Sequence, residues 1–396
     1  MQGRIAKKQM EKPKLTRLNK GNEKDRGVRS FFLRFLQLEK GGFTMELFWN
    51  TQRNLWQKLQ ETTLPIVLYG MGNGAVKLLH MCRVYGIVVS AIFASDDFVR
   101  GQSFAGLPVQ HLADLEETYE DFVILVAFGS HDKAVMARID DLARRHPLYL
   151  PDLPVAGEEW FDAAFLESHQ EEALQAEALW ADEPSRQLYE NLLHYKWSGE
   201  LAYLQKTVDD EAVWQLLQPW AGEYYWDIGA YDGDSIAAFL QASEMNAQQI
   251  IAWEPDPKNF RKLQKNITAW HLSNVTLLPY VAYHESCTLS FAAGAGRGSA
   301  IAASGLPVVA KTIDEVRGVG KCTLLKIDAE GVEKEVLQGA ATTLRECRPK
   351  LRLAAYHRPG DLWDLPLQLQ SLQPSYQLYL RRGRCYPAWD VDIIAL

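Results

Sequence analysis

Short apolar runs alternate with amphipathic stretches in two separate blocks of this chain. In the first block, from residue 45 to about 150, the runs LPIVLYG and FVILVAFG are each followed by a helical pattern, GAVKLLHMCRVYG or KAVMARIDDLARRH. Apolar strands that alternate with helices indicate a parallel sheet covered by helices. We therefore expect residues 45–150 to form a small α/β domain.

The second block, residues 221–396, predicts a larger sheet. Its strand patterns are YYWDIG, IIAWEP, VTLLPYVAY, TLLKID, LRLAAYH, YQLYLRR and VDIIAL. Only GRCYPAWD separates the last two, which is too short for the helix of a parallel crossover, so they should form an antiparallel hairpin at a sheet edge. This layout resembles the Rossmann-like sheet of class I methyltransferases. Residues 151–220 have helical patterns and are expected to connect the two domains.

The charge of the chain is unevenly distributed. Residues 1–44 hold 12 Lys and Arg against 4 Asp and Glu, whereas the rest of the chain holds 30 against 46. The acidic remainder is not expected to attract nucleic acid. The basic composition of residues 1–44 predicts a disordered tail. Alternatively, translation starts at Met45, because the codons for Lys40-Gly41-Gly42 can spell a ribosome-binding sequence just upstream.

The cysteines and the apolar runs bear on location. Five cysteines are scattered without a CxxC pair, so neither a disulfide framework nor a structural zinc site is indicated. A reducing cytoplasm is the expected location. The sequence contains no apolar run of the roughly 20 residues that a membrane span needs, and its start lacks the pattern of a signal peptide.

The stretch WDIGAYDGDS, residues 226–235, has the outline of a glycine loop between a strand and a helix. Such loops often bind pyrophosphate, but the carboxylates of Asp227 and its neighbours would repel that dianion. S-adenosylmethionine is different, because its sulfonium and ammonium charges outweigh its one carboxylate. We expect Asp227 near the ammonium group, with Gly229 and Gly233 letting the backbone approach. For Asp234, helix capping is an equally good explanation.

A second acid supports an adenosine site. Glu254 ends the next strand in IIAWEPDP, 27 residues after Asp227, where a carboxylate can accept both ribose hydroxyls.

The stretch LLKIDAEGVEKEVLQGA, residues 324–340, places Asp328 and Glu330 at the end of another strand. His357 follows the neighbouring strand and should emerge at the same edge. Methyl transfer to a hydroxyl needs a positioned acceptor and removal of its proton, and Asp328 and His357 are the candidate bases. Asp328, Glu330 and His357 could instead hold a divalent cation, although two carboxylates and one histidine indicate a metal site only weakly. A further alternative is that the two acids pair with Lys326 and Arg358.

The motifs WDIGAYDGDS, IIAWEPDPKNFRKLQKNI, LLKIDAEGVEKEVLQGA and LAAYHRPGDLWDLP together resemble the FkbM family of S-adenosylmethionine-dependent methyltransferases. The resemblance covers about residues 221–396. It implies cofactor contacts at Asp227, Gly229 and Glu254, and an active-site role for Asp328 and Glu330. We expect the adjoining Ala230, Gly233, Asp234 and Pro255 to belong to the cofactor site as well. It also implies O-methylation of hydroxyls on sugars or similar small acceptors, as in carbohydrate biosynthesis.

The first block has its own glycine turn, with Gly70, Gly72 and Gly74 in LYGMGNGAVKLLHMC. It resembles the N-terminal domain of sugar O-acyltransferases, which implies a site for a nucleotide or nucleotide-sugar. A tight turn needs glycine regardless, so an inert scaffold is an equal alternative. Two competing functions remain, namely an NAD(P)-dependent oxidoreductase built on this block and a non-catalytic protein that binds S-adenosylmethionine or nucleotide-sugar.

Overall fold

The computed structural model describes residues 48–206, 212–220, 222–292, 300–301, 305–318 and 320–396. The predictions for the basic segment 1–44 and for Met45 lie outside these residues. The described residues all belong to one compact unit, Leu47–Leu396. Within them no helix is both long and apolar enough to cross a membrane.

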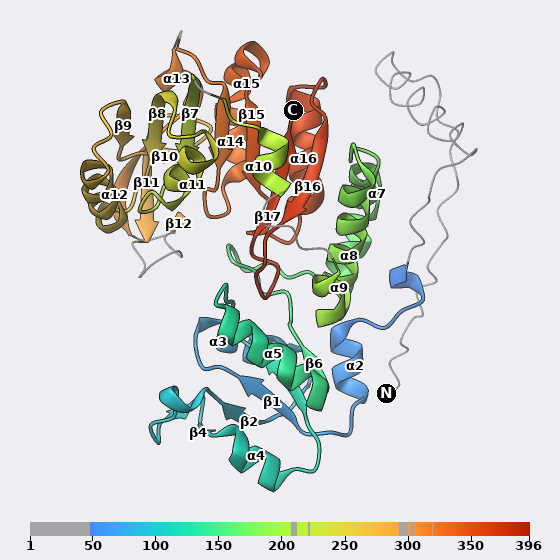
Figure 1. Ribbon diagram of the computed structural model, residues 1–396. Coiled ribbons are helices and arrows are strands. Elements are labelled where there is room, and N and C mark those ends of the chain that lie inside the picture. The colour runs from blue at the N-terminus through green and yellow to red at the C-terminus, as the bar shows by residue number, and fades with distance from the viewer. Residues whose placement is uncertain (1–47, 207–211, 221, 293–299, 302–304, 319) are drawn as a thin grey trace, which may run out of the picture. The chain divides into compact units, whose positions relative to one another are not determined.

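The first block forms a six-stranded sheet, here called the front sheet (Figure 1). Its strands are β1 (Ile66–Tyr69), β2 (Val89–Phe93), β3 (Ser103–Phe104), β4 (Leu107–Gln110), β5 (Val123–Val126) and β6 (Leu148–Tyr149), in the order β3-β4-β2-β1-β5-β6. Strand β3 is antiparallel to β4, and the other pairs are parallel. The helices and short 3₁₀ turns are η1 (Phe48–Asn50), α2 (Leu55–Glu61), α3 (Asn73–Val84), η2 (Asp96–Phe98), α4 (Leu112–Thr118) and α5 (Lys133–Arg145).

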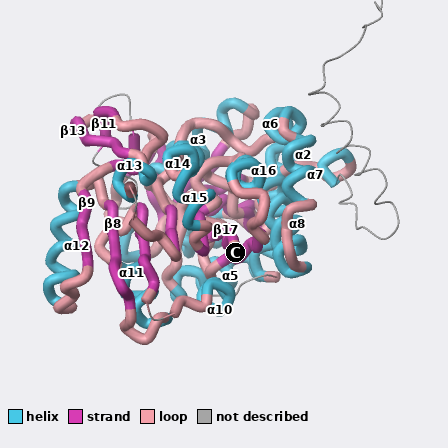
Figure 2. Tube along the Cα trace, turned by 90° about the horizontal axis from the view of Figure 1, so that it is seen from above, coloured by secondary structure: helices cyan, strands magenta, loops and turns pink. Residues whose placement is uncertain are grey.

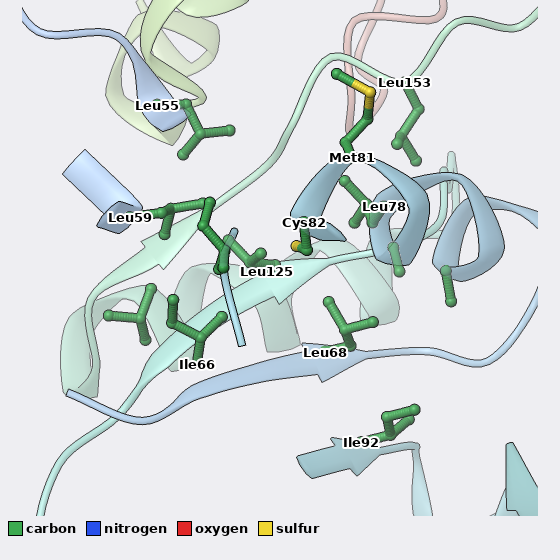
Figure 3. Close-up of a cluster of buried hydrophobic side chains, with 14 of the residues drawn as sticks. Leu55, Leu59, Ile66, Leu68, Leu78, Met81, Cys82, Ile92, Leu125 and Leu153 are labelled. Carbon is green, nitrogen blue, oxygen red and sulfur yellow. The ribbon is translucent and has the colours of Figure 1, made fainter. Parts of the chain in front are cut away.

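The core of this block explains the apolar runs in the sequence. Every residue of β1 and β5 is buried, because helices cover both faces of these central strands. Figure 3 shows leucines of α2 and the Leu78, Met81 and Cys82 side chains of α3 gathered over Ile66, Leu68 and Leu125 of the strands.

The second block forms a seven-stranded sheet, here called the rear sheet, in the order β16-β17-β15-β14-β7-β8-β9. Its strands are β7 (Glu223–Ile228), β8 (Ala247–Trp253), β9 (Val275–Leu278), β14 (Leu324–Ile327), β15 (Lys350–Ala354), β16 (Leu378–Arg382) and β17 (Val391–Ala395). The predicted five parallel strands and the antiparallel hairpin are confirmed. The last strand, β17, inserts between β15 and β16.

Helices flank the rear sheet. They are α11 (Asp234–Ala242), α12 (Pro257–Ala269), α13 (Ile313–Arg317), α14 (Glu333–Gly339), α15 (Ala341–Cys347) and α16 (Asp361–Leu372). Figures 1 and 2 both show α12 beside β9 at one edge of the sheet.

The run VTLLPYVAY differs from its prediction as one strand. It is divided into β9 and β10 (Val281–Ala282), and Pro279 lies between them. Proline has no N–H to donate to a ladder, so the chain leaves the rear sheet at this point. Strand β10 joins a four-stranded sheet with β11 (Cys287–Ala292), β12 (Ala300–Ile301) and β13 (Leu306–Lys311), which the sequence analysis missed.

Helices occupy much of the segment between the two sheets, although residues 151–162 are not helical. The helices are α6 (Ala163–Ser168), α7 (Gln170–Glu177), α8 (Glu183–Ser198), α9 (Leu201–Gln205) and α10 (Ala212–Leu217). Asp182 caps the start of α8, and Gly199, with φ of 67°, ends it in the left-handed region. Asp182 also pairs with Arg381 of β16, which holds α8 against the rear sheet.

Candidate active site

A cleft of about 960 Å³ lies at the carboxyl ends of the rear strands. The loops that follow β7, β8, β14 and β15 contribute Gly229, Glu254, Asp328 and His357, among others, to its lining. Ligands of open α/β sheets bind at this edge. The volume is near the upper end of the roughly 300–1,000 Å³ of ordinary ligand sites.

The loop after β7 depends on its glycines. Gly229 has φ of 80°, and a Cβ atom there would lie 1.9 Å from the carbonyl oxygen of Asp328. Gly233 has φ of 98° and is the cap residue of α11. Only glycine adopts such angles without strain. Ala230 is buried and donates its N–H to the Trp253 carbonyl at 2.9 Å. The predicted residues Gly229, Ala230 and Gly233 thus shape this loop, and Gly229 lines the cleft.

Asp227 does not reach the cleft lining. Its side chain is fully buried and accepts a hydrogen bond from the Ser235 hydroxyl. Lys326 Nζ lies 3.2 Å from Asp227 Oδ1, 3.7 Å from Asp328 Oδ2 and 2.8 Å from the Gly229 carbonyl oxygen. The lysine therefore joins the loop after β7 to the end of β14. Asp234, in contrast, is exposed and lines the cleft.

Glu254 lies where the sequence analysis expects it, at the carboxyl end of β8. Its carboxylate is 6% exposed and accepts the Tyr231 N–H at 2.9 Å and the Asp256 N–H at 2.8 Å, one on each oxygen. Burial raises the pKa of Glu254 to about 7, although these two N–H groups favour the charged form. Pro255 follows it and also lines the cleft.

The structure brings Asp328, Glu330 and His357 together, as predicted, and adds Glu333. We call these four residues the acid–imidazole cluster. His357 Nε2 lies 3.5 Å from Asp328 Oδ1 and 3.6 Å from Glu330 Oε2, and His357 Nδ1 lies 3.0 Å from Glu333 Oε1. Asp328, Glu330 and His357 line the cleft. Both ring nitrogens therefore face carboxylates.

The pKa values in the acid–imidazole cluster follow from burial and from the charges that face one another. Burial alone would lower the pKa of His357, but the three carboxylates, Glu333 above all, raise it to about 10. Burial raises the pKa of Glu330 to about 7 against the opposing charge of His357. Burial would also raise the pKa of Asp328, but the charges of Lys326 and His357 hold it below its usual range. At neutral pH His357 is thus a cation, Asp328 is ionised and Glu330 is poised to exchange a proton.

The donor set of this cluster does not fit a divalent cation well. Asp328, Glu333 and His357 offer ligand atoms within 4.8 Å of one another. However, these groups already pair with one another, since His357 Nδ1 lies 3.0 Å from Glu333 Oε1 and His357 Nε2 lies 3.5 Å from Asp328 Oδ1. The ion would also have to displace the proton that His357 holds between carboxylates. We therefore derive no step of the reaction from a metal.

The loop after β5 of the front sheet reaches the same cleft. Gly129, Ser130 and His131 are among its lining residues, as are Trp389 and Asp390 from the β16–β17 connection. Ser130 exchanges two backbone hydrogen bonds with Tyr386, of 2.7 and 3.1 Å. A Cβ atom on Gly129 would lie 2.2 Å from the Trp389 ring, so only glycine lets this loop approach. The first block thus forms part of the site.

The glycine turn of the front sheet lies outside the cleft lining. A Cβ atom on Gly74 would lie 2.1 Å from the Ala127 carbonyl oxygen, and Gly70 has φ of 112° and lies against Phe128. Packing and backbone conformation therefore account for two of the three glycines. Gly72 faces open space. The nucleotide site and the oxidoreductase both stay predictions.

Several site residues were missed by the sequence analysis. Lys326 carried a signal, since it is a charge inside the apolar strand LLKI, and all four residues of that strand are buried. Glu333, which the sequence places at a helix start, was assigned no role in the site. His131 was considered as a contact but interpreted as an exposed loop residue, and Trp389 gave no local signal, because only the packing of the two blocks brings them to the cleft.

The order of the rear strands, with β17 inserted before β16 and a cleft at the carboxyl ends, defines a Rossmann-like methyltransferase fold. Residues 227–377 match the methyltransferase FkbM domain. The chain therefore carries an FkbM methyltransferase domain and is an S-adenosylmethionine-dependent methyltransferase, as the sequence resemblance predicts.

Comparison with solved structures supports the fold. The crystal structure of methyltransferase FkbM from Methylobacillus flagellatus KT has a TM-score of 0.67 and 19% identity, and covers 93% of this chain and 99% of its own. A precorrin-6y C5,15-methyltransferase from Geobacter metallireducens GS-15 covers 47% of this chain and 85% of its own, with a TM-score of 0.33 and 15% identity. The chain matches none of the curated protein sequences with which it was compared.

Proposed function

We propose that the protein transfers a methyl group from S-adenosylmethionine to a hydroxyl of a sugar, a glycan precursor or a similar small acceptor. The observation that carries this proposal is that Asp328 and Glu330 face the same cleft as the loops after β7 and β8. Carboxylates at that place can orient a hydroxyl group and accept its proton. When bound, the cofactor supplies the activated methyl group.

The residues at one end of the cleft suit the cofactor. Each oxygen of Glu254 accepts one backbone N–H and keeps a second lone pair, so the carboxylate can still bind two ribose hydroxyls. We assign the contact with the ammonium group to Asp234, which lines the cleft, and a supporting role beneath the loop to Asp227. Gly229, Ala230, Gly233 and Pro255 would shape the backbone around the cofactor.

The catalytic roles follow from the charges of the acid–imidazole cluster. Glu330 would be the general base, because its pKa of about 7 matches a proton transfer near neutral pH. Asp328 would orient the acceptor hydroxyl. His357, as a cation, would hold the two carboxylates in place rather than act as a base.

The cleft lining from the loop after β5 and the β16–β17 connection suits a sugar. It combines the Trp389 ring with polar residues, including Ser130 and His131. A sugar ring has an apolar C–H face that an aromatic ring can cover, while its hydroxyls need hydrogen-bonding partners. A nucleotide-linked acceptor is a further part of the proposal, with support limited to the open space at Gly72. A cytoplasmic location is proposed because no disulfide joins any of the five cysteines, all of which lie among the described residues.

The reaction can be tested directly. The full chain would be incubated with methyl-labelled S-adenosylmethionine and a panel of nucleotide-linked sugars and simple glycosides. We expect label in an ether linkage on a sugar oxygen. Transfer to amines, and to no hydroxyl in the panel, would refute O-methylation of sugars.

Glu254→Ala tests the cofactor end of the cleft. Loss of both ribose hydrogen bonds should weaken binding of S-adenosylmethionine at least tenfold, about 1.4 kcal/mol, in calorimetric titration. Glu167→Ala is the control, because Glu167 is an exposed residue of α6 outside the cleft lining. Equal affinity in folded Glu254→Ala and wild-type protein would contradict the assignment.

A further inference from the structure

Glu333 holds the loop that carries the two cleft carboxylates. Its side chain is 1% exposed, at the first position of α14. Glu333 Oε1 accepts the Ala329 N–H at 2.7 Å and the Gly331 N–H at 3.3 Å, on either side of Glu330. One buried oxygen thus ties down the backbone before and after Glu330.

The loop needs such a restraint because its backbone is strained. Glu330 has φ of 54°, in the left-handed region that side chains rarely adopt. A residue in that region is strained and persists only where its surroundings enforce it. Gly331, with φ of 95°, is held from the other side, where its carbonyl accepts a hydrogen bond from Arg358 Nε.

The same oxygen also lies against the His357 ring, as an ion pair. Glu333 Oε1 lies 3.0 Å from His357 Nδ1, which leaves Nε2 facing Asp328 and Glu330 at 3.5 and 3.6 Å. The His357 carbonyl accepts the Ala156 N–H at 2.9 Å, so the backbone of this residue is fixed as well. Glu333, the imidazole ring and the cleft carboxylates therefore form one continuous chain of contacts.

We propose that Glu333 is a positioning residue of the methyl-transfer site, which fixes the conformation of the loop 329–331 and places a buried negative charge against the His357 ring. Glu333 does not face the cleft, so it acts through Glu330 and His357 rather than on the substrate. The proposal deepens the proposed function and rests on it for the catalytic consequence.

The charges around His357 agree with this role. Glu333 faces the ring from α14, Asp328 and Glu330 face it from the loop after β14, and the charge of Asp361 in α16 also acts on it. Burial opposes the charged form of Glu333, but the imidazolium holds the pKa of Glu333 below its usual value. Among the acids, Glu333 raises the pKa of His357 the most.

Glu333→Gln separates the charge from the hydrogen bonds. The amide oxygen of Gln can still accept the two backbone N–H groups, whereas the negative charge beside His357 is lost. We expect the nitrogen-15 NMR signals of the His357 ring, assigned with His357→Gln, to titrate at least one pH unit lower than in wild-type protein. The kcat of methyl transfer should fall about tenfold to a hundredfold, with the dissociation constant of S-adenosylmethionine within twofold.

Two further variants complete the test. Glu335→Gln, on the same helix, is the matched control and should change neither the NMR titration nor kcat. Glu333→Asp keeps the charge and should partly restore the titration; it also carries the measurements if Glu333→Gln does not fold. An unchanged His357 titration in folded Glu333→Gln would overturn the proposal, as would equal losses in kcat and cofactor affinity in that variant. The titration needs neither cofactor nor acceptor, so its result stands apart from that of the proposed function.

Discussion

Glu330→Gln is expected to lower kcat by a factor of about 10² to 10⁴, which is the usual contribution of a general base. The amide has nearly the shape of the carboxylate but cannot accept the proton of the acceptor hydroxyl. Because Glu330 lines the part of the cleft beside Asp328, the binding of S-adenosylmethionine should stay within twofold of the wild-type value. Initial rates and calorimetric titration measure the two quantities separately.

The pH dependence gives the same prediction a second test. Burial raises the pKa of Glu330 to about 7, so its carboxylate is protonated below that pH and ionised above it. At saturating S-adenosylmethionine, where protonation of Glu254 no longer limits cofactor binding, the wild-type kcat/KM for the acceptor should rise as the pH increases from 6 to 8. This rise should be absent in Glu330→Gln.

A matched control guards against a general effect of losing a carboxylate. Glu167→Gln, in an exposed position on α6, should keep the wild-type rate and pH profile. If folded Glu330→Gln retains more than half of the wild-type kcat, or the same rise with pH, Glu330 is not the base.

Lys326→Met is expected to lower the free energy of unfolding by about 3–5 kcal/mol, because it leaves the carboxylate of Asp227 buried without its cation. Asp227 is 0% exposed, and Lys326 Nζ also donates to the Gly229 carbonyl oxygen. Burial alone would lower the pKa of Lys326, but the charges of Asp227 and Asp328 outweigh it and raise that pKa. Urea denaturation followed by circular dichroism measures the change.

The double variant Lys326→Met/Asp227→Asn shows whether the unpaired charge is the cause. Removing the stranded carboxylate should recover part of the lost stability, so the double variant should be more stable than the sum of the single changes predicts. Lys334→Met is the control, since its ion pair with Asp364 is half exposed and should contribute less than about 1 kcal/mol. Strict additivity in the double variant would contradict the coupling of Lys326 and Asp227.

The division of VTLLPYVAY into two strands shows what an apolar run in the sequence can and cannot predict about strands. The run was predicted as one strand because its apolar content is continuous, yet Pro279 ends the pairing and sends the chain into a separate sheet. Strands β11 and β13 were missed, although the alternation of half-buried Cys287 and Leu289 with exposed Thr288 and Ser290 was a usable signal. The edge strands of that sheet, β10 and β12, have only two residues each and so cannot show a period.

The sequence likewise placed some of the candidate site residues correctly and one of them incorrectly. Glu254, Asp328, Glu330 and His357 could be placed from the sequence because each follows a predicted strand, and parallel strands bring their carboxyl ends to one edge. Asp227 was expected to contact the cofactor, but the structure places its side chain beneath the loop, against Lys326. Sequence spacing places a residue at a strand end without showing whether its side chain points into the cleft or into the core.

The sequence by itself determined the element types, the closing hairpin, the methyltransferase fold and the loops that carry the candidate site, since these follow from local periodicity and from motifs at strand ends. The tertiary structure decided which carboxylate is buried, which imidazole is charged, and that the loop 129–131 and Trp389 join the cleft. Burial and charge depend on neighbours that are distant in the chain, and those neighbours are determined only by how the two sheets and their connecting helices pack.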